Sequence, residues 1–152
     1  VRMSIQETAG DASNSMSDWT ITYDKNSVGP VDVPTSDGGA GISTATAGLT
    51  NGNATTERLT AGTGSFQAGE QITDGEATDF QEAASAYMEM VWGITIYAAN
   101  VADTDTFDFS FTVTAETKAT DTHTMRVTIQ KTGGSIIPQA SYHYTKNTGS
   151  GL

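Results

Sequence analysis

Three aspartates lie close together in the connection between two predicted strands. Asp103, Asp105 and Asp108 fall where one alternating stretch ends and the next begins. Carboxylate oxygens in a turn are ligands that Ca²⁺ prefers, but the EF-hand pattern with its closing glutamate is missing. Aspartate also favours turns because its side chain bonds to the nearby backbone. The pattern favours turn-forming, solubilising carboxylates, with a Ca²⁺ site as the alternative.

Residue patterns that would support catalysis are sparse. His123 and His143 fall on polar positions of predicted strands or at their starts, where we expect solvated side chains. Cysteine is absent, which excludes thiol nucleophiles, thiolate metal sites and disulfides. Carboxylate pairs such as Asp103 with Asp105 could serve a glycosidase, but a chain with 18 acidic residues contains such pairs by chance. We predict a protein that is not an enzyme, with no catalytic residue and no cofactor other than the Ca²⁺ alternative.

Tyrosines supply the candidate binding surface. Tyr87 and Tyr97 lie on the outward parity of one predicted strand, and Tyr142 and Tyr144 share one face of the last. Outward tyrosines suit subunit interfaces, because the ring buries area while the hydroxyl keeps a hydrogen bond, and they also suit carbohydrate binding. We favour an interface. The first strand adds three further interface candidates on an edge, namely Val1, Met3 and Ile5.

These residues belong to strands that the hydrophobic pattern predicts. Apolar residues recur at every second position three times within residues 84–130, which predicts three strands in an antiparallel meander or a sandwich corner. Further strands are predicted around Val1, around Trp19 as a core anchor, at an edge between Pro30 and Pro34, and at the C-terminal end. The apolar positions of the three central stretches are Met88, Met90, Trp92, Ile94, Ile96, Phe107, Phe109, Phe111, Val113, Met125, Val127 and Ile129.

The rest of the chain is rich in turn residues. Residues 35–69 are dense in Gly, Ser, Thr and Asn, and residues 67–80 appear as another loop-rich crossing. Residues 80–86 could form a helical turn or stay extended. Six to eight short strands without a long helix predict an all-β antiparallel β-sandwich, immunoglobulin-like or jelly-roll-like, with an open barrel as the alternative. We expect one sandwich domain over residues 1–145 and a loose tail over residues 146–152.

Composition narrows the partners. The 152 residues carry a net charge of −11 with only seven basic residues, which argues against nucleic acid. No apolar run is long enough to span a bilayer, so we expect no membrane. The acidic surface is explained most simply by solubility, and the alternative explanation is docking to a basic partner. Abundant Thr, Ser, Gly and Asn are typical of extracellular or virion-surface β proteins.

Turn and strand motifs resemble a known type of module. The chain is similar to an immunoglobulin-like β-sandwich domain common in virion and bacterial surface proteins of marine and environmental phages and bacteria. The resemblance implies a structural role and no reaction. One departure is Phe109-Ser110-Phe111, where such domains usually have Phe-Arg-Val. The resemblance covers residues 1–129 and rests on residues 2–5, 19–23, 49–59, 62–66, 68–70, 88–89 and 98–109.

The function that we predict is a non-enzymatic phage virion protein, specifically a capsid decoration protein on the particle surface. Its expected partners are the major capsid protein or another virion protein and further copies of itself, with docking through residues 35–69. The alternatives are a tail or fibre component, and an extracellular or cell-surface filament subunit that donates residues 1–6 to its neighbour. A carbohydrate-binding adhesin using Tyr87 and Tyr97, or the Asp103 turn with Ca²⁺, is the last alternative.

Overall fold

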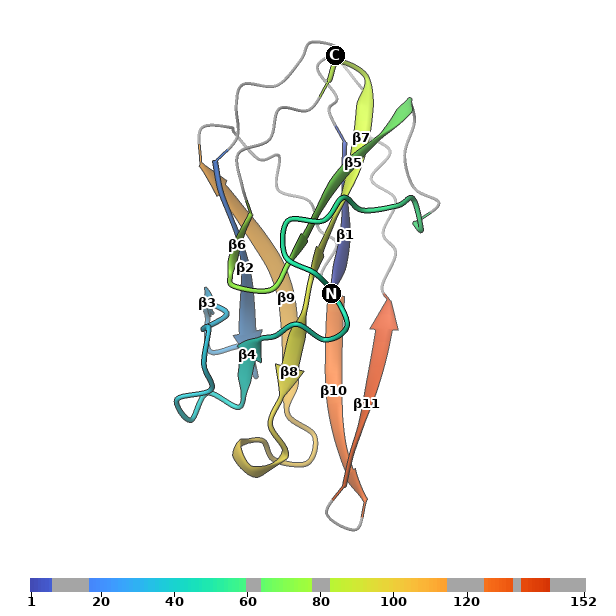
Figure 1. Cartoon of the computed structure of the whole chain (residues 1–152). Helices are drawn as coiled ribbons and strands as arrows, with labels where there is room; N and C mark the ends of the chain where they lie inside the picture. Colours follow the sequence, from blue (N-terminus) through green and yellow to red (C-terminus); the bar gives the residue numbers. More distant parts are fainter. Residues whose placement is uncertain (7–16, 60–63, 78–82, 115–124, 133–134, 143–152) are drawn as a thin grey trace.

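A computed structural model describes residues 1–6, 17–59, 64–77, 83–114, 125–132 and 135–142 (Figure 1). β-Strands dominate these residues, and the only helical element among them is the short 3-10 turn η1 (Ala98–Asn100). The protein is therefore all-β, as predicted. The strands are β1 (Arg2–Gln6), β2 (Ser17–Lys25), β3 (Pro30–Asp32), β4 (Ile42–Thr44), β5 (Ser65–Ile72), β6 (Glu76–Ala77), β7 (Ala86–Trp92), β8 (Ile94–Ile96), β9 (Thr106–Thr114), β10 (Met125–Thr132) and β11 (Ser135–Tyr142).

Two sheets contain most of the strands. One is ordered β11-β10-β9-β2-β3, with β6 also paired to β2, and the other is ordered β1-β7-β5. A small third sheet joins β4 to β8. A single hydrophobic core includes Ile21 of β2, Phe107 of β9 and Met90 of β7. Because this core takes side chains from both large sheets, the architecture is sandwich-like (Figure 1).

Alternating side chains explain the large sheet. Phe107 and Phe109 of β9 are buried while Asp108 and Ser110 between them are partly exposed, as the period of two predicts. The neighbours β9 and β10 are antiparallel, with Met125 opposite Phe109. Among the described strands, β3 and β11 lie at the two ends of this sheet. β3 begins at Pro30, and β11 contains Pro138. Both positions suit proline, because an edge strand needs fewer backbone donors, and the predicted edge at Pro30 is confirmed.

Of the two predicted arrangements of the three central strands, the single antiparallel meander is wrong, whereas the sandwich corner agrees with the sheet order. β7 pairs with β1 and with β5, whereas β9 pairs with β2 and β10, so the chain passes from one large sheet to the other between β7 and β9. The stretch expected as one strand also divides at Gly93. There the backbone of Ala45 approaches so closely that a side chain would collide with it, and Ala45 N donates to Gly93 O at 2.9 Å. Period-two alternation is the same for a hairpin and for a crossover, so the pattern alone did not separate them.

β5 lies where the sequence predicted loops. Its residues pair in parallel with β7, with Phe66 opposite Tyr87 and Ile72 opposite Trp92. The composition SFQAGEQI has little apolar alternation, and a register shift interrupts the ladder between Ala68 and Gln71. The strand conformation of β5 therefore depends on its pairing with the strongly apolar β7 and not on its own β-propensity.

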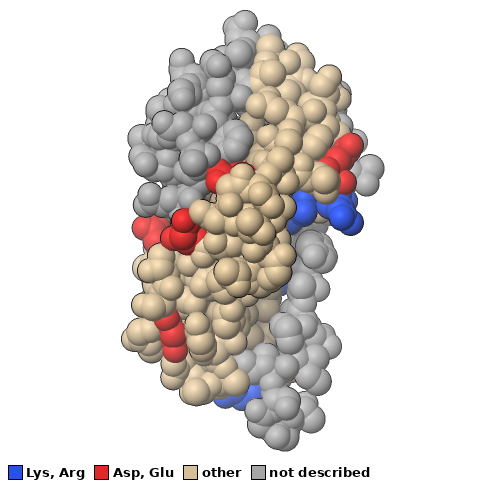
Figure 2. Space-filling model, in the orientation of Figure 1, with Lys and Arg blue, Asp and Glu red and all other residues tan. Residues whose placement is uncertain are grey.

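Several predictions fall outside the described residues. These are the positions of His123, His143 and Tyr144, residues 80–82 of the ambiguous helical segment, and the tail. The described residues 83–85 of that segment form no helix, and residue 86 begins β7. Trp19 belongs to β2 and Tyr142 to β11, but their side chains are outside the described part. In the ranges that the structure covers, no helix is long and apolar enough to cross a membrane. Figure 2 shows acidic side chains spread over one face and basic ones at two places on it.

Candidate functional site

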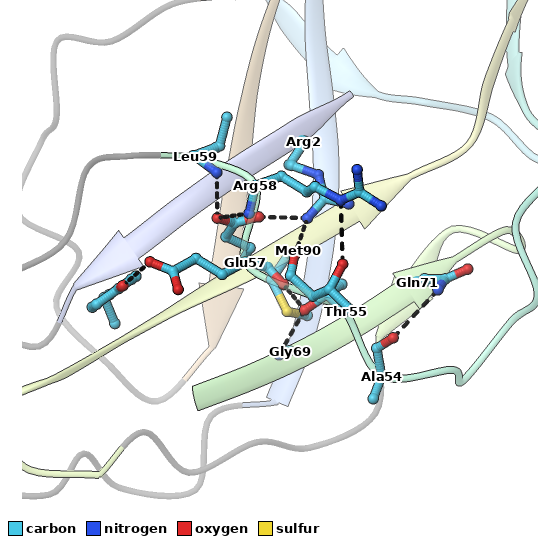
Figure 3. A network of polar contacts seen from close by, with 12 residues as sticks. Arg2, Ala54, Thr55, Glu57, Arg58, Leu59, Gly69, Gln71 and Met90 are labelled. Atoms are coloured by element: carbon cyan, nitrogen blue, oxygen red, sulfur yellow. Dashed lines mark hydrogen bonds and ion pairs between the residues drawn. The ribbon is translucent and has the colours of Figure 1, made fainter. Parts of the chain in front are cut away.

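β7 is buried on both of its faces. All seven of its residues are buried, although alternation predicts one wet face. Met88, Met90 and Trp92 point into the hydrophobic core. The opposite parity, with Tyr87, Glu89 and Val91, is also inaccessible. Hydrogen bonds between residues 55–59 and the residues Tyr87 and Glu89 show what lies over this second face (Figure 3). We call residues 53–59 the clamped segment.

Glu89 is the centre of the contact. Its side chain has no exposed surface, and each of its two carboxylate oxygens has a partner within the protein. Oε1 accepts the backbone N–H of Arg58 at 2.8 Å and that of Leu59 at 2.6 Å. Oε2 forms an ion pair with the Arg2 guanidinium of β1. A buried charge is tolerated only when it is paired and hydrogen-bonded, and these three groups provide that compensation.

Further bonds attach the same segment along its length. Thr55, which is buried, donates from its hydroxyl to Glu89 O at 2.7 Å and accepts from Gly69 N at 2.9 Å. Gly69 has no room for a side chain, because a Cβ there would collide with the Glu89 carbonyl and the Met90 sulfur. Arg2 Nη1 also donates to the Thr56 carbonyl at 2.9 Å. The segment is thus tied to β1, β5 and β7 together (Figure 3).

The outward side of the clamped segment remains accessible. Thr56, Glu57 and Arg58 are exposed. The carboxylate of Glu57 accepts a hydrogen bond from the Tyr87 hydroxyl. Arg58 donates its backbone N–H to Glu89, and its Nε donates to the Thr56 hydroxyl at 3.3 Å. The hydrogen bonds around Glu89, which we call the clamp, therefore hold the backbone of the clamped segment and leave the Arg58 guanidinium on the surface. The conformation of this segment is thus fixed by contacts within the protein itself.

The electrostatic balance at Glu89 favours its charged form. Burial alone raises the pKa of Glu89, but the hydrogen bonds from Leu59, Arg58 and Arg2, with the attraction of the Arg2 guanidinium, leave that pKa below its ordinary value. A folded-state pKa below the unfolded one means that ionised Glu89 stabilises the fold above pH about 4.3. This contribution is lost as the pH falls through the folded-state pKa.

We predict a corresponding loss of stability in acid. The melting temperature should fall as the pH is lowered from about 4.3 into the range below it, because Glu89 must then take up a proton in its buried site. Glu89→Gln should show a smaller acid-dependent decrease, since it lacks the titrating group. Asp105→Asn is the comparison at another site: the pKa of Asp105 is also lowered although burial opposes the shift, so this variant should likewise reduce the acid-dependent decrease. If Glu89→Gln retained the full acid dependence, Glu89 would not be its source.

The three candidate Ca²⁺ ligands serve separate partners. Asp103 accepts the Lys131 backbone N–H at 2.8 Å, and Asp108 accepts from Arg126 at 2.6 Å. Asp105 Oδ2 accepts the backbone N–H of Ala102 at 2.8 Å and pairs with Lys25 at 3.2 Å. Their carboxylates are thus directed to different protein groups. Within the described ranges, no cluster of three or more His, Asp or Glu side chains could hold a metal ion.

The tyrosines do not form the expected platform. Tyr87 lies on the face of β7 opposite the core residues, as its parity predicts, but its expected exposure is wrong: it is only 6% exposed, because the clamped segment covers that face. Tyr97 is 36% exposed, and its hydroxyl lies 3.0 Å from that of Ser43 in β4. Val1, Met3 and Ile5 pack partly against the core at the edge of the three-stranded sheet. Their use as an interface stays a prediction, as does that of Tyr97 and Tyr142.

Sequence reasoning missed Glu89 and Arg2. The available signal was a charged residue inside the apolar run Met88-Glu89-Met90-Val91-Trp92. A glutamate on a strand that is otherwise apolar requires a cation or several N–H donors if its second face is covered. Arg2, on another strand with alternating apolar residues, was the nearest cation of matching parity once the two strands pair with Ser4 opposite Glu89.

No protein-family model, no curated protein and no solved structure matches this chain. The class that fold and site define is an all-β, sandwich-like protein with a clamped surface segment.

Proposed function

We propose that the protein is a non-enzymatic structural module of a phage virion, specifically a capsid decoration protein that docks through the clamped segment. The observation that carries this proposal is the fully buried Glu89 carboxylate, whose bonds hold an otherwise irregular surface segment. Holding a loop in advance lowers the entropic cost of docking. A protein that binds a lattice through one surface gains directly from such a device.

The use of the other carboxylates supports a structural role. Asp24 accepts the Gly29 N–H at 2.9 Å, and Asp37 accepts the Gly41 N–H at 2.7 Å. Asp105 and Asn26 join two loops through a hydrogen bond of 2.9 Å. These acids fix turns by satisfying backbone donors or neighbouring side chains. The resemblance to virion and surface modules and the net charge of −11, which keeps particles apart in solution, agree with the same role.

The virion partner would be the major capsid protein or another virion protein, and copies of this chain would lie side by side on the particle. A tail or fibre component and an extracellular filament subunit remain alternatives that use the same fold. The adhesin alternative loses one of its two aromatic platforms, because Tyr87 is buried.

A charge reversal in the clamped segment tests the docking surface. Arg58→Glu should leave the melting temperature nearly unchanged, because the clamp uses the Arg58 backbone N–H. It should weaken co-sedimentation of the purified chain with virus-sized particles banded from the culture that produces it. The expected loss is about tenfold in affinity, as for one interface charge worth about 1.4 kcal/mol.

Lys131→Glu is the matched control. It makes the same change of charge on β10, where the described contact of Lys131 with Asp103 uses the backbone N–H. Binding should survive this change. If the wild-type chain did not co-sediment with particles, the proposed function would be wrong. Equal losses in both variants would indicate general electrostatic attraction in place of docking through the clamped segment.

A further inference from the structure

β1 is attached to the fold through a small set of contacts. It lies at one end of the three-stranded sheet and pairs only with β7 among the described strands. Its apolar residues are half-buried, in contrast to β7, whose residues are all buried. Edge strands with little burial open at lower free energy than the centre of a sheet. β5 is the other end strand of this sheet, but Ala54 bridges to its Glu70 and three of its residues are buried, whereas β1 has none that is fully buried. We therefore expect β1 to separate from β7 more readily than β5 does.

The place beside β7 is specific for the sequence of β1. On the core side, Met3 lies opposite Met90 and Ile5 opposite Met88. On the other side, the Glu89 carboxylate pairs with Arg2. If β1 leaves, Glu89 loses its cation while still buried under the clamped segment, which is strongly unfavourable. The vacated site thus requires a strand that brings an arginine in register with alternating apolar residues.

We propose that this strand can come from a second copy of the chain, so that neighbouring copies exchange β1. A second copy carries the required arginine and apolar residues by construction, and every contact of the closed form is reproduced between chains. Residues 7–16, which join β1 to β2, can span about 33 Å when extended. That length is enough to reach past the edge of the sheet to an adjacent molecule.

Exchange becomes favourable when copies are held close together. Copies fixed near one another have a high effective concentration, so a strand from a neighbour competes with the chain's own strand. The inference rests on the fold and on the Arg2–Glu89 pair, and it applies equally to a capsid lattice, a fibre or a filament. Strand exchange also joins the clamped segment to the neighbour, because the Arg2 that stabilises Glu89 would belong to the other copy.

Cysteine pairing between two variants tests the exchange, and the absence of native cysteine makes the background clean. One chain carries Met3→Cys and a second, differently tagged chain carries Met90→Cys; these positions are directly opposite in the β1–β7 ladder. Opposite residues have the Cα separation that a disulfide needs. The two proteins are mixed at high concentration, oxidised with copper phenanthroline and separated by non-reducing electrophoresis. We expect a covalent dimer that contains both tags.

Two controls make the result decisive. Met3→Cys mixed with Val28→Cys reports random collision, because Val28 is 88% exposed and more accessible than buried Met90; it should give severalfold less mixed dimer. The double variant Met3→Cys/Met90→Cys in one chain verifies that the ladder geometry permits the bond. If the double variant closes internally while the mixed chains give no more dimer than the collision control, exchange is overturned. Ile5→Cys with Met88→Cys repeats the test at the next opposite pair, should Met90→Cys not fold.

Discussion

Replacing Glu89 with alanine is expected to lower the free energy of unfolding by about 2–3 kcal/mol. The change leaves the Arg2 guanidinium without its carboxylate, and it leaves the backbone N–H groups of Arg58 and Leu59 without their acceptor. Unsatisfied buried groups are costly even where the original interaction contributes little net stability. Urea denaturation monitored by tryptophan fluorescence measures the loss.

Hydrogen exchange then shows where the loss acts. The amides of Arg58 and Leu59 should lose protection in Glu89→Ala, while amides in the β2–β9 ladder should change only with global stability. Glu89→Gln is the control of equal size, and it should fall between the wild type and alanine because its amide oxygen can still accept. A loss below about 1 kcal/mol for Glu89→Ala would contradict the clamp.

Trp92→Ala is expected to lower the free energy of unfolding by about 3–5 kcal/mol. Trp92 is the largest of the fully buried side chains, and it ends β7 in the core that both sheets share. Removal of its ring leaves a cavity that a close-packed core fills only in part. The same denaturation experiment, monitored by circular dichroism because the change removes a fluorophore, provides the measurement.

Trp92→Phe separates packing from polar contacts at the same position. The indole Nε1 is buried and has no hydrogen-bond partner among the described residues. Phenylalanine keeps an aromatic ring and removes this unsatisfied donor, so its cost should be less than half that of alanine. Equal losses in the two variants would show that the indole nitrogen has an essential partner.

The fold class was predictable because alternation is a local property. Phe107 and Phe109 alternate with Asp108 and Ser110, and this pattern alone predicts a strand with one buried face. Sheet membership is a property of the whole chain. The alternating stretch of β7 has the same local pattern whether it pairs with β9 or, as here, with β1 and β5.

The candidate site was less predictable because a distant segment creates it. Tyr87 occupies a position that alternation makes outward, and only the clamped segment, about thirty residues earlier, covers it. Likewise Glu89 and Arg2 are 87 residues apart in sequence and become partners through the β1–β7 ladder. Asp103 lies in a turn, as expected, whereas Asp108 lies within β9. The individual hydrogen bonds of Asp105 depend on loops such as the one that contains Asn26.

Immunogold electron microscopy tests the proposed function most directly. An antibody to this chain would be applied to the lysate or culture that produces it, with pre-immune serum as the control. The account predicts label distributed evenly over icosahedral heads, as expected for a decoration protein on a capsid lattice. Label confined to tails, or running along filaments attached to cells, would contradict that role.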